Sequence, residues 1–270
     1  MDPRTTTITL TFGDQAENHV GMERIGTMAP DGFNAEELRD RVGPALSGQR
    51  WDVEYIDLSQ HLASQWSKYS EFSASDLDAG VLILRNGVDR LLQRTPYTTS
   101  DLFREQIALD VDRRVFMYGT VRNKHARYNL CFADYSQEPD YANGRGRIID
   151  FASLPVTRAV REGLPAILGP RAAGMQGEGN YYYDVSKCGI GWHGDSERRR
   201  VVGVRLGQSM PLHYCWFYRG QPVTTPVQLT IRGGDIYVMS EKAVGTDWKR
   251  KVVPTLRHSA GARKYTDLPT

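Results

Sequence analysis

The sequence predicts an α+β protein with a mainly β core of the jelly-roll kind, preceded by an N-terminal α/β extension. Up to about residue 110, helical and strand patterns are mixed. Between residues 111 and 270, short strand patterns bounded by Gly, Pro or charged turns dominate, and a single helical pattern interrupts them. Such a run of short strands is typical of sandwiches and barrels. We therefore expect two parts: residues 1–110, an extension of unknown role, and residues 111–270, a β domain.

Two strands and two helices are predicted in the first part. They are a strand over Thr7–Phe12, a helix over Asn34–Leu46, a strand over Val81–Leu84 and a helix over Ser100–Leu109. Polar and apolar residues alternate in the first strand, as they do on a half-buried pleated surface. Each helix opens with a polar residue that can cap its N-terminus and continues with acidic residues in the first turn.

Six strands and one helix are predicted in the second part. The strands are Val115–Val121, Arg147–Phe151, Val201–Leu206, Leu212–Tyr218, Val227–Ile231 and Asp235–Met239. The helical pattern covers Val156–Leu168, where Pro165 predicts either a break or two short helices. No Gly-rich phosphate loop precedes a helix, which argues against folds built for a nucleotide cofactor.

The composition limits the partners and the compartment. The chain has 270 residues with 34 basic and 32 acidic side chains, so nucleic-acid binding would need a local basic patch. The three cysteines form no CxxC pair, which argues against a disulfide-linked partner or a structural zinc site. We find no signal peptide and no apolar run long enough to span a bilayer, and we expect a cytoplasmic or nuclear protein without a membrane partner.

The densest chemical signal is the segment around His193 and Asp195. These residues are separated by one position, and in a strand residues i and i+2 point to the same face. An imidazole and a carboxylate form a mixed N/O donor set that suits iron(II), and a second histidine would complete a facial triad with open positions. Those positions can accept a bidentate oxo-acid and dioxygen.

Two histidines follow Asp195 and can supply the third ligand. His213 lies within an aromatic strand pattern, where a packed and hydrogen-bonded histidine is expected. His258 is placed at a strand-to-turn junction and is our choice. Arg263 and Lys264 follow it, and a cation there could hold the distal carboxylate of an oxo-acid by a salt bridge.

The order of these residues resembles the AlkB-like branch of the 2-oxoglutarate/iron(II) dioxygenases. The resemblance lies in Asn180-x-Tyr182, His193-x-Asp195-x-Glu197, the aromatic strand Leu212–Tyr218, Gly234–Met239, Trp248, His258 and Arg263. Members of this family fold as a double-stranded β-helix, a form of jelly roll, behind a nucleotide-recognition lid. They oxidise alkyl groups on nucleic-acid bases with iron(II), 2-oxoglutarate and dioxygen.

The resemblance implies a role for individual residues. It implies iron ligation by His193, Asp195 and His258; 2-oxoglutarate binding by Asn180, Tyr182 and Arg263; a place near the substrate base for Glu197; and a lid over residues 113–145 with Arg127 and a base-stacking Tyr128. No catalytic residue beyond the metal site is predicted. The family's second arginine would fall on Pro269, so Lys264 or Arg205 could share or take the carboxylate role.

The function predicted in this way is oxidative dealkylation or hydroxylation of a DNA or RNA base. The same oxygenase chemistry on a protein side chain or a small metabolite is the first alternative, because fold and triad do not fix the substrate. A non-catalytic jelly-roll binding module is a lower alternative, and a zinc hydrolase with the same ligands stays open. The run Arg198–Arg200 is either a solvated charged face or a phosphate contact.

Overall fold

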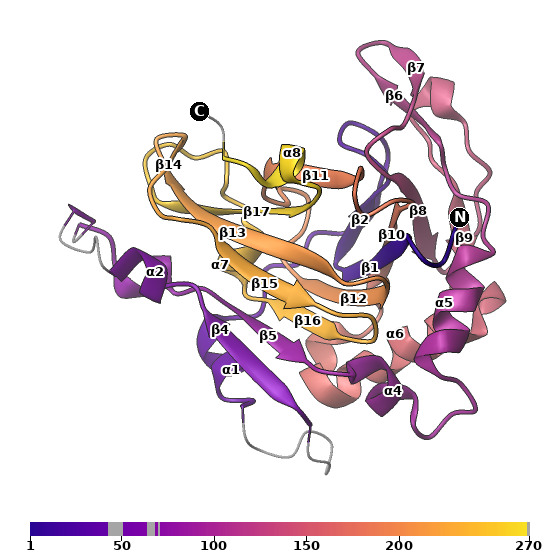
Figure 1. Cartoon of the computed structure of the whole chain (residues 1–270), viewed down its shortest axis with the longest axis horizontal. Coiled ribbons are helices and arrows are strands. Elements are labelled where there is room, and N and C mark those ends of the chain that lie inside the picture. The colour runs from indigo at the N-terminus through magenta and orange to yellow at the C-terminus, as the bar shows by residue number, and fades with distance from the viewer. Residues whose placement is uncertain (43–50, 64–67, 70, 269–270) are drawn as a thin grey trace.

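The computed structural model describes residues 1–42, 51–63, 68–69 and 71–268, which form two β-sheets with helices around them (Figure 1). The larger sheet has eight strands in the order β4 (Val53–Asp57), β5 (Gly80–Leu84), β16 (Ile236–Met239), β12 (Val201–Gly207), β1 (Thr7–Gly13), β10 (Gln176–Tyr182), β8 (Tyr128–Ala133) and β9 (Ile148–Asp150). The smaller sheet has five strands: β11 (Gly189–His193), β17 (Thr255–Gly261), β13 (Met210–Tyr218), β14 (Gln221–Pro222) and β15 (Val227–Ile231). The predicted mainly β, α+β character is confirmed.

Strand β1 lies in the middle of the larger sheet. It pairs antiparallel with β10 on one side and with β12 on the other, and all seven of its residues are buried. Strands β4 and β5 extend the same sheet beyond β16. The predicted division at residue 110 therefore does not hold, because three strands from before it share one sheet with strands from after it.

The two faces of the larger sheet differ in polarity. On one face, Ile8, Leu10 and Phe12 of β1 join a hydrophobic core with side chains of α4 (Gly87–Leu92), α5 (Thr99–Ile107) and α6 (Pro155–Leu168). These three helices gather at the lower right of the molecule in Figure 1. The other face carries the threonines of β1 and looks toward the smaller sheet, with which it shares a second core that includes Tyr237 and Trp216. The alternation TITLTF thus separates a core face from a polar face.

The remaining elements are two hairpins and several short helices. They are β2 (Gln15–Glu17) with β3 (Arg24–Gly26), β6 (Arg114–Met117) with β7 (Thr120–Asn123), the helices α1 (Ala35–Arg39), α2 (Gln60–Ala63), α3 (Ala74–Leu77), α7 (Glu241–Val244) and α8 (Arg263–Thr266), and the 3-10 turns η2 (Tyr141–Asn143), η3 (Phe151–Ser153) and η4 (Pro170–Ala172). The β6–β7 hairpin projects from the top right of the molecule in Figure 1.

Several predicted elements differ from those observed. The single strand over Val115–Val121 is wrong, because Tyr118 and Gly119 adopt positive φ angles of 53° and 75° and turn the chain into the β6–β7 hairpin. Helix α6 continues through Pro165. The helix over Asn34–Leu46 forms only as α1, with Asn34 as its N-cap, and residues 43–46 lie outside the described part of the chain.

Two further observations concern partners. Cys131, Cys188 and Cys215 are free and buried. In the part of the chain that the structure describes, no helix is both long and apolar enough to cross a bilayer.

Candidate metal centre

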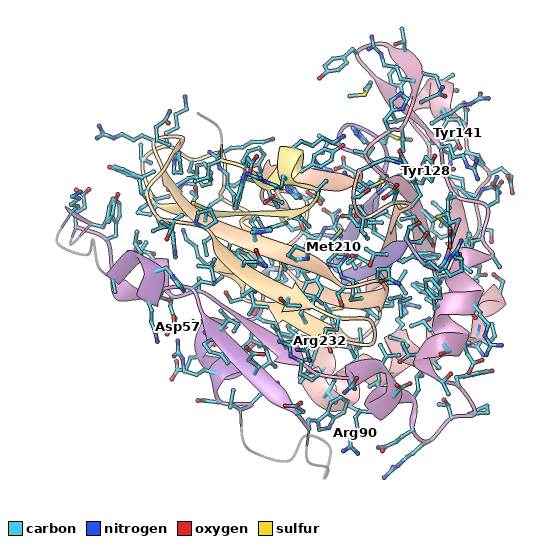
Figure 2. The ribbon with its side chains drawn as sticks, in the orientation of Figure 1. Asp57, Arg90, Tyr128, Tyr141, Met210 and Arg232 are labelled. Carbon is cyan, nitrogen blue, oxygen red and sulfur yellow. The ribbon has the colours of Figure 1, made fainter. Side chains whose placement is uncertain are left out.

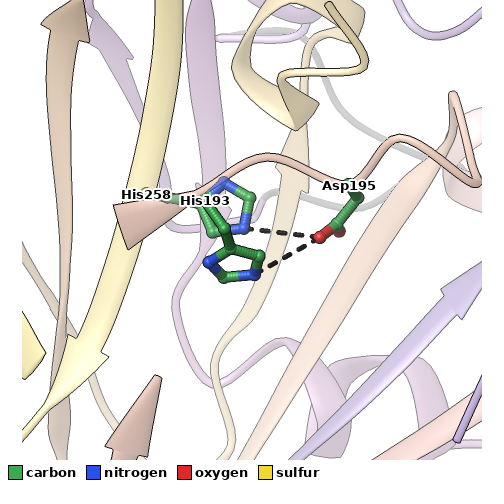
Figure 3. A group of neighbouring side chains, drawn as sticks. All are labelled: His193, Asp195 and His258. Carbon is green, nitrogen blue, oxygen red and sulfur yellow. Dashed lines mark ion pairs between the residues drawn. The ribbon is translucent and has the colours of Figure 1, made fainter. Parts of the chain in front are cut away.

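The structure brings the side chains of His193, Asp195 and His258 together (Figure 3). One ligand atom from each residue lies within 4.8 Å of the other two. The Nε2 atoms of His193 and His258 lie 3.5 Å and 3.7 Å from the same carboxylate oxygen, Asp195 Oδ1. Two imidazoles and one carboxylate that converge in this way match the donor set of a 2-His-1-carboxylate site.

Backbone pairing in the smaller sheet positions the two histidines. His193 ends β11 and lies directly opposite His258 in β17, after an irregularity in the register that begins at Ile190. His258 therefore lies within a strand, and the predicted strand-to-turn junction is wrong. His193 Nδ1 is 2.7 Å from the carbonyl oxygen of Gly191 and can donate to it, which turns Nε2 toward Asp195.

An irregular segment after the strand, not a continuing strand, positions Asp195. Strand β11 ends at His193, so the predicted i, i+2 geometry of a strand is wrong for this pair. The backbone N–H of Asp195 instead donates to the carbonyl oxygen of Val244 at 3.0 Å. A Cβ on the intervening Gly194 would lie 2.2 Å from the carbonyl oxygen of Gly245, so only glycine fits between the two ligands.

The electrostatic environment favours the protonation states that bind a metal. Burial, together with the nearby His193, lowers the pKa of His258 to about 3, so this imidazole is neutral near pH 7. Burial alone would raise the pKa of Asp195, but its contacts with His193, Arg198 and His258 outweigh it and hold that pKa below its usual range. A neutral imidazole and an ionised carboxylate are the forms that coordinate metal ions.

The three side chains form part of the wall of a cavity between the two sheets, with a volume of about 170 Å³. The polar face of the larger sheet forms another part of the wall. That part includes Thr9 and Thr11 of β1, Asn180 and Tyr182 of β10, Arg205 of β12 and Tyr237 of β16. The structure thus places Asn180 and Tyr182, both predicted to bind cosubstrate, in the same cavity as the triad.

Arg205 is a buried cation in this cavity that forms no ion pair among the described residues. Arg205 is 1% exposed, and its Nε and Nη1 atoms have no hydrogen-bond partner among the described residues. Burial lowers its pKa, although Tyr237, Tyr182 and Asp235 act in the opposite direction. A guanidinium stays charged in proteins, so a buried one without a partner is costly unless an anion binds to it.

Arg263 and Lys264 do not reach the cavity. Both lie exposed on α8, the side chain of Arg263 is 93% exposed, and its nearest carboxylate is Asp267 at 3.8 Å. Lys264 lies over the ring of Tyr265. The predicted roles of these two residues in cosubstrate binding are therefore not compatible with their positions, and Arg205, the alternative predicted for this role, lies where a carboxylate can be bound.

His213 lies apart from the triad. Its Nε2 atom is 3.2 Å from Gln228 Oε1, and its ring packs beside Trp192. The choice of His258 over His213 agrees with this arrangement.

A buried network of charges lies beside Asp195. Arg198 is 3% exposed, and its guanidinium contacts Glu197 at 2.7 Å, Asp195 at 3.8 Å and Glu178 at closer range. Burial raises the pKa of Glu197. Arg199 and Arg200 instead pair with Glu241 and Asp31 nearer the surface. The pairs of Arg199 and Arg200 agree with the predicted solvated charged face, whereas Arg198 is buried and differs from it.

The predicted substrate residues are only partly brought together. Glu197 and Arg127 are among the residues that line the cavity, and Arg127 Nε donates to Asn180 Oδ1 at 2.6 Å. Tyr128 is not among them. Its ring stacks on Tyr183 with centroids 4.9 Å apart, and Figure 2 shows it at the base of the β6–β7 hairpin.

The β6–β7 hairpin and the segment after it expose cations and an aromatic ring. Tyr118 at its tip is 83% exposed, and the guanidinium of Arg122 lies 5.6 Å from the centre of its ring. Arg113, Arg114, Arg122 and Arg127 have no carboxylate within ion-pair distance in the described ranges. The predicted lid region therefore carries unpaired positive charge, and Arg127 links it to the cavity.

Lys124, directly after this hairpin, makes buried hydrogen bonds to other parts of the molecule. Its Nζ donates to Asn18 Oδ1 at 2.6 Å and to Asn129 Oδ1 at 2.8 Å, and burial lowers its pKa from 10.5 to about 7. Both partners are neutral amides, so the charge of the ammonium is left without a carboxylate in direct contact. The lysine is protonated below about pH 7 at a cost in desolvation.

We expect the stability lost through this buried charge to be recovered as the pH rises. The folded pKa lies below the unfolded one, so between about pH 7 and pH 10 the unfolded chain binds more protons and unfolding becomes less favourable, by up to about 1.4 kcal/mol per pH unit. The measurement is urea unfolding of the wild type and of Lys124→Met at pH 6.5 and pH 9. The wild type should gain stability relative to the variant at the higher pH, and an equal difference at both values would contradict a depressed pKa.

Sequence reasoning missed several residues of the site. Thr9 and Thr11 were predicted only as parts of a strand, Glu178 was not singled out, and Arg198 was named only within a charged run, without its inward direction. The alternation of threonine with large apolar residues in β1 was the available signal, because it marks one face of a strand as polar. Nothing in that pattern indicates what the polar face lines.

Comparison with known proteins identifies one relative along nearly the whole chain. No protein-family model matches the sequence. The uncharacterized protein R156 of Acanthamoeba polyphaga mimivirus is 42% identical over 260 residues, which cover 96% of this chain and 97% of the viral protein. Because the match covers 96% of this chain, it extends over most of residues 1–110. At this identity and coverage, the chain belongs to the same protein family as mimivirus R156.

Proposed function

We propose that this protein is an iron(II)- and 2-oxoglutarate-dependent oxygenase. One observation carries the proposal: the two histidines and the aspartate converge on the wall of a cavity that also holds a buried, unpartnered arginine. A metal site with open positions and a nearby cation is the arrangement that a bidentate oxo-acid with a second carboxylate requires.

The residues present fit such a group. His193, Asp195 and His258 would hold the metal through three atoms and leave the other positions of an octahedral ion free. Arg205 would hold the distal carboxylate of 2-oxoglutarate, and Asn180 and Tyr182 lie in the same wall for further hydrogen bonds. Iron(II), when bound with 2-oxoglutarate and dioxygen, supplies the oxidation of a substrate C–H bond, with succinate and carbon dioxide as co-products.

The strand topology supports a double-stranded β-helix. From β10 through β13 successive strands alternate between the two sheets, and after β15 in the smaller sheet β16 and β17 alternate again. A jelly roll has eight strands. We infer that β1 takes the place of the eighth strand, between β12 and β10, although it comes first in the chain. Among the described residues, no strand of the larger sheet follows β17, so no such strand can supply the cation of the cavity. The neighbouring strand β12 supplies it instead.

The protein's own contribution is orientation and exclusion of water. Asp195 and the two imidazoles fix the metal, Arg205 fixes the far end of the cosubstrate, and Tyr237 lies across Gly203, where a Cβ would meet its ring at 2.0 Å. The two sheets cover these groups on both sides, which strengthens the charge interactions among them. A substrate is then held with its reacting carbon next to the metal, where small misplacements are costly.

We propose a nucleic-acid base as the substrate. Four arginines without carboxylate partners and an exposed tyrosine lie on the predicted lid, and they can contact phosphates and stack on a base. Glu197 and Arg127 line the cavity and can contact the base itself. The location that goes with this substrate is the cytoplasm or the nucleus.

A small polar metabolite or a protein side chain is the second candidate. The cavity is small, and Glu17, Glu178 and Glu197 are buried carboxylates in its wall, which suits a compact substrate with N–H donors. A binding module without catalysis explains the cavity less well. Such a module does not need a buried Arg205 without a partner beside the three converging side chains.

The test is turnover of 2-oxoglutarate to succinate with iron(II), measured with a panel of methylated oligonucleotides, nucleosides and peptides. We expect succinate release above the level without substrate for oligonucleotides, and binding that weakens steeply with salt because phosphates are neutralised. Salt-independent turnover of a nucleoside or a peptide would favour the second candidate. If no succinate forms with any member of the panel, and none forms without substrate, the proposed reaction is contradicted.

A further inference from the structure

Arg198 lies where it can control how Asp195 binds a metal. It belongs to the connection between β11 and β12, three residues after Asp195, and its side chain points inward. Its guanidinium lies between Asp195, Glu197 and Glu178, and the residue is 3% exposed. A planar group with five N–H donors can contact several carboxylates at once, which an ammonium on a flexible stem cannot do in the same geometry.

The two carboxylate oxygens of Asp195 face different groups. Oδ1 lies 3.5 Å and 3.7 Å from the two imidazole Nε2 atoms, on the side where a metal would bind. Oδ2 lies 3.8 Å from Arg198 Nε, on the opposite side. The carboxylate is therefore oriented with one oxygen toward the triad and the other toward the guanidinium.

The position of Arg198 is itself fixed from the larger sheet. Glu178 of β10 accepts from Arg198 Nη2, and Asn180 Nδ2 donates to the other oxygen of Glu178 at 2.9 Å. Glu197 accepts from Nε at 3.0 Å and from Nη2 at 2.7 Å. Two buried carboxylates, those of Glu178 and Glu197, and the partly buried Asp195 surround one guanidinium. Any displacement of Arg198 is costly, because it would leave the two buried charges without a partner.

We propose that Arg198 is a positioning residue, anchored by Glu178, that holds Asp195 in a one-oxygen binding mode and thereby keeps the position beside it free for cosubstrate or oxygen. The proposal rests on the proposed metal site. A bidentate carboxylate would take up one of the three positions that the triad leaves open. Arg198 itself contacts neither the metal nor the substrate in this role, and it acts through Asp195.

The test uses Mn(II) as a probe, because the water-proton relaxivity of the Mn(II)-loaded protein reports how many exchangeable waters the bound ion carries. We expect about three such waters in the wild type. In Arg198→Lys, which keeps the charge but not the planar contact, Asp195 can close onto the ion with both oxygens. The relaxivity per bound ion should then fall by about one third.

Two further variants make the result specific. Arg199→Lys is the matched control, since Arg199 pairs with Glu241 nearer the surface, and its relaxivity should equal that of the wild type. Glu178→Gln removes the charge that anchors Arg198, while Arg198 and the three ligands keep their side chains. This variant should also have a lower relaxivity than the wild type. If Arg198→Lys does not fold, as judged by its melting curve, Glu178→Gln decides the question.

The possible failures are distinguishable. A wild type that binds no Mn(II), or whose Mn(II) affinity is the same in Asp195→Ala, would overturn the proposed metal centre and the role of Arg198 with it. Binding that depends on Asp195, with the same relaxivity in Arg198→Lys or, if that variant does not fold, in Glu178→Gln, would overturn the role of Arg198 alone.

Discussion

Replacement of Arg205 by methionine is expected to weaken 2-oxoglutarate binding by about 2–5 kcal/mol, or roughly 30-fold to several thousand-fold. The reason is the loss of a buried charge that would otherwise pair with the distal carboxylate. The measurement is anaerobic titration of the iron-loaded protein with 2-oxoglutarate. Arg263→Met is the matched control and should leave the affinity unchanged, because the side chain of Arg263 is 93% exposed on α8.

The same substitution should stabilise the protein without ligand. Two guanidinium nitrogens of Arg205 are buried without a partner, so an apolar side chain of similar length removes a desolvation cost. Replacing buried charges with apolar residues often gains about 1–4 kcal/mol of unfolding free energy. Urea unfolding of both variants measures this.

For the affinity measurement, one outcome would contradict the assignment. An affinity that falls in Arg263→Met but not in Arg205→Met would show that the cation has been assigned to the wrong element.

Replacement of Asp195 by alanine is expected to abolish stable metal binding. Loss of a partner that only orients a ligand costs about 10- to 100-fold in metal affinity, so loss of one of three ligands should exceed that range. The metal content after anaerobic loading and desalting measures this, with Asp267→Ala on the protein surface as the matched control. An equal iron content in wild type and Asp195→Ala would show that the ion, if any, binds elsewhere.

The strand in β1 was predictable, but its neighbours were not. The alternation in Thr7–Phe12 identifies a strand with one polar and one apolar face, and the structure has that strand. Its partners are β10 and β12, which lie more than 160 residues away in sequence, at Gln176–Tyr182 and Val201–Gly207. A local pattern says nothing of such pairing, and this is why the boundary at residue 110 was placed wrongly.

That the side chains of His193, Asp195 and His258 come together was predictable, because the first two are separated by one residue and two histidines follow them in the chain. His193 and Asp195 lie close together whether a strand or a turn connects them, so the prediction held although its geometric reason was wrong. His258 followed by elimination, since His213 lies in a strand that turns it toward Gln228. The cation was harder to place, because Arg263 follows the last histidine in the chain whereas Arg205 lies near the triad only in space.

Arg205 and Gly119 each had a signal in the sequence. Arg205 is the only charged residue in the apolar strand Val201–Gly207, and a charge at a buried strand position indicates a partner or a ligand. Gly119 follows Tyr118 in the middle of the predicted strand Val115–Val121, and a glycine there favours a hairpin turn. Both signals are short, and the apolar pattern around them outweighed them in the prediction.

The central claim is that His193, Asp195 and His258 hold an iron(II) ion that also binds 2-oxoglutarate. The most direct test is the visible absorption spectrum of the iron(II)-loaded protein under nitrogen, before and after 2-oxoglutarate is added. We expect a new absorption band that saturates at about one equivalent of iron per chain and is absent from Asp195→Ala. A wild type that binds iron(II) through these residues but shows no band and no affinity for 2-oxoglutarate would contradict the claim.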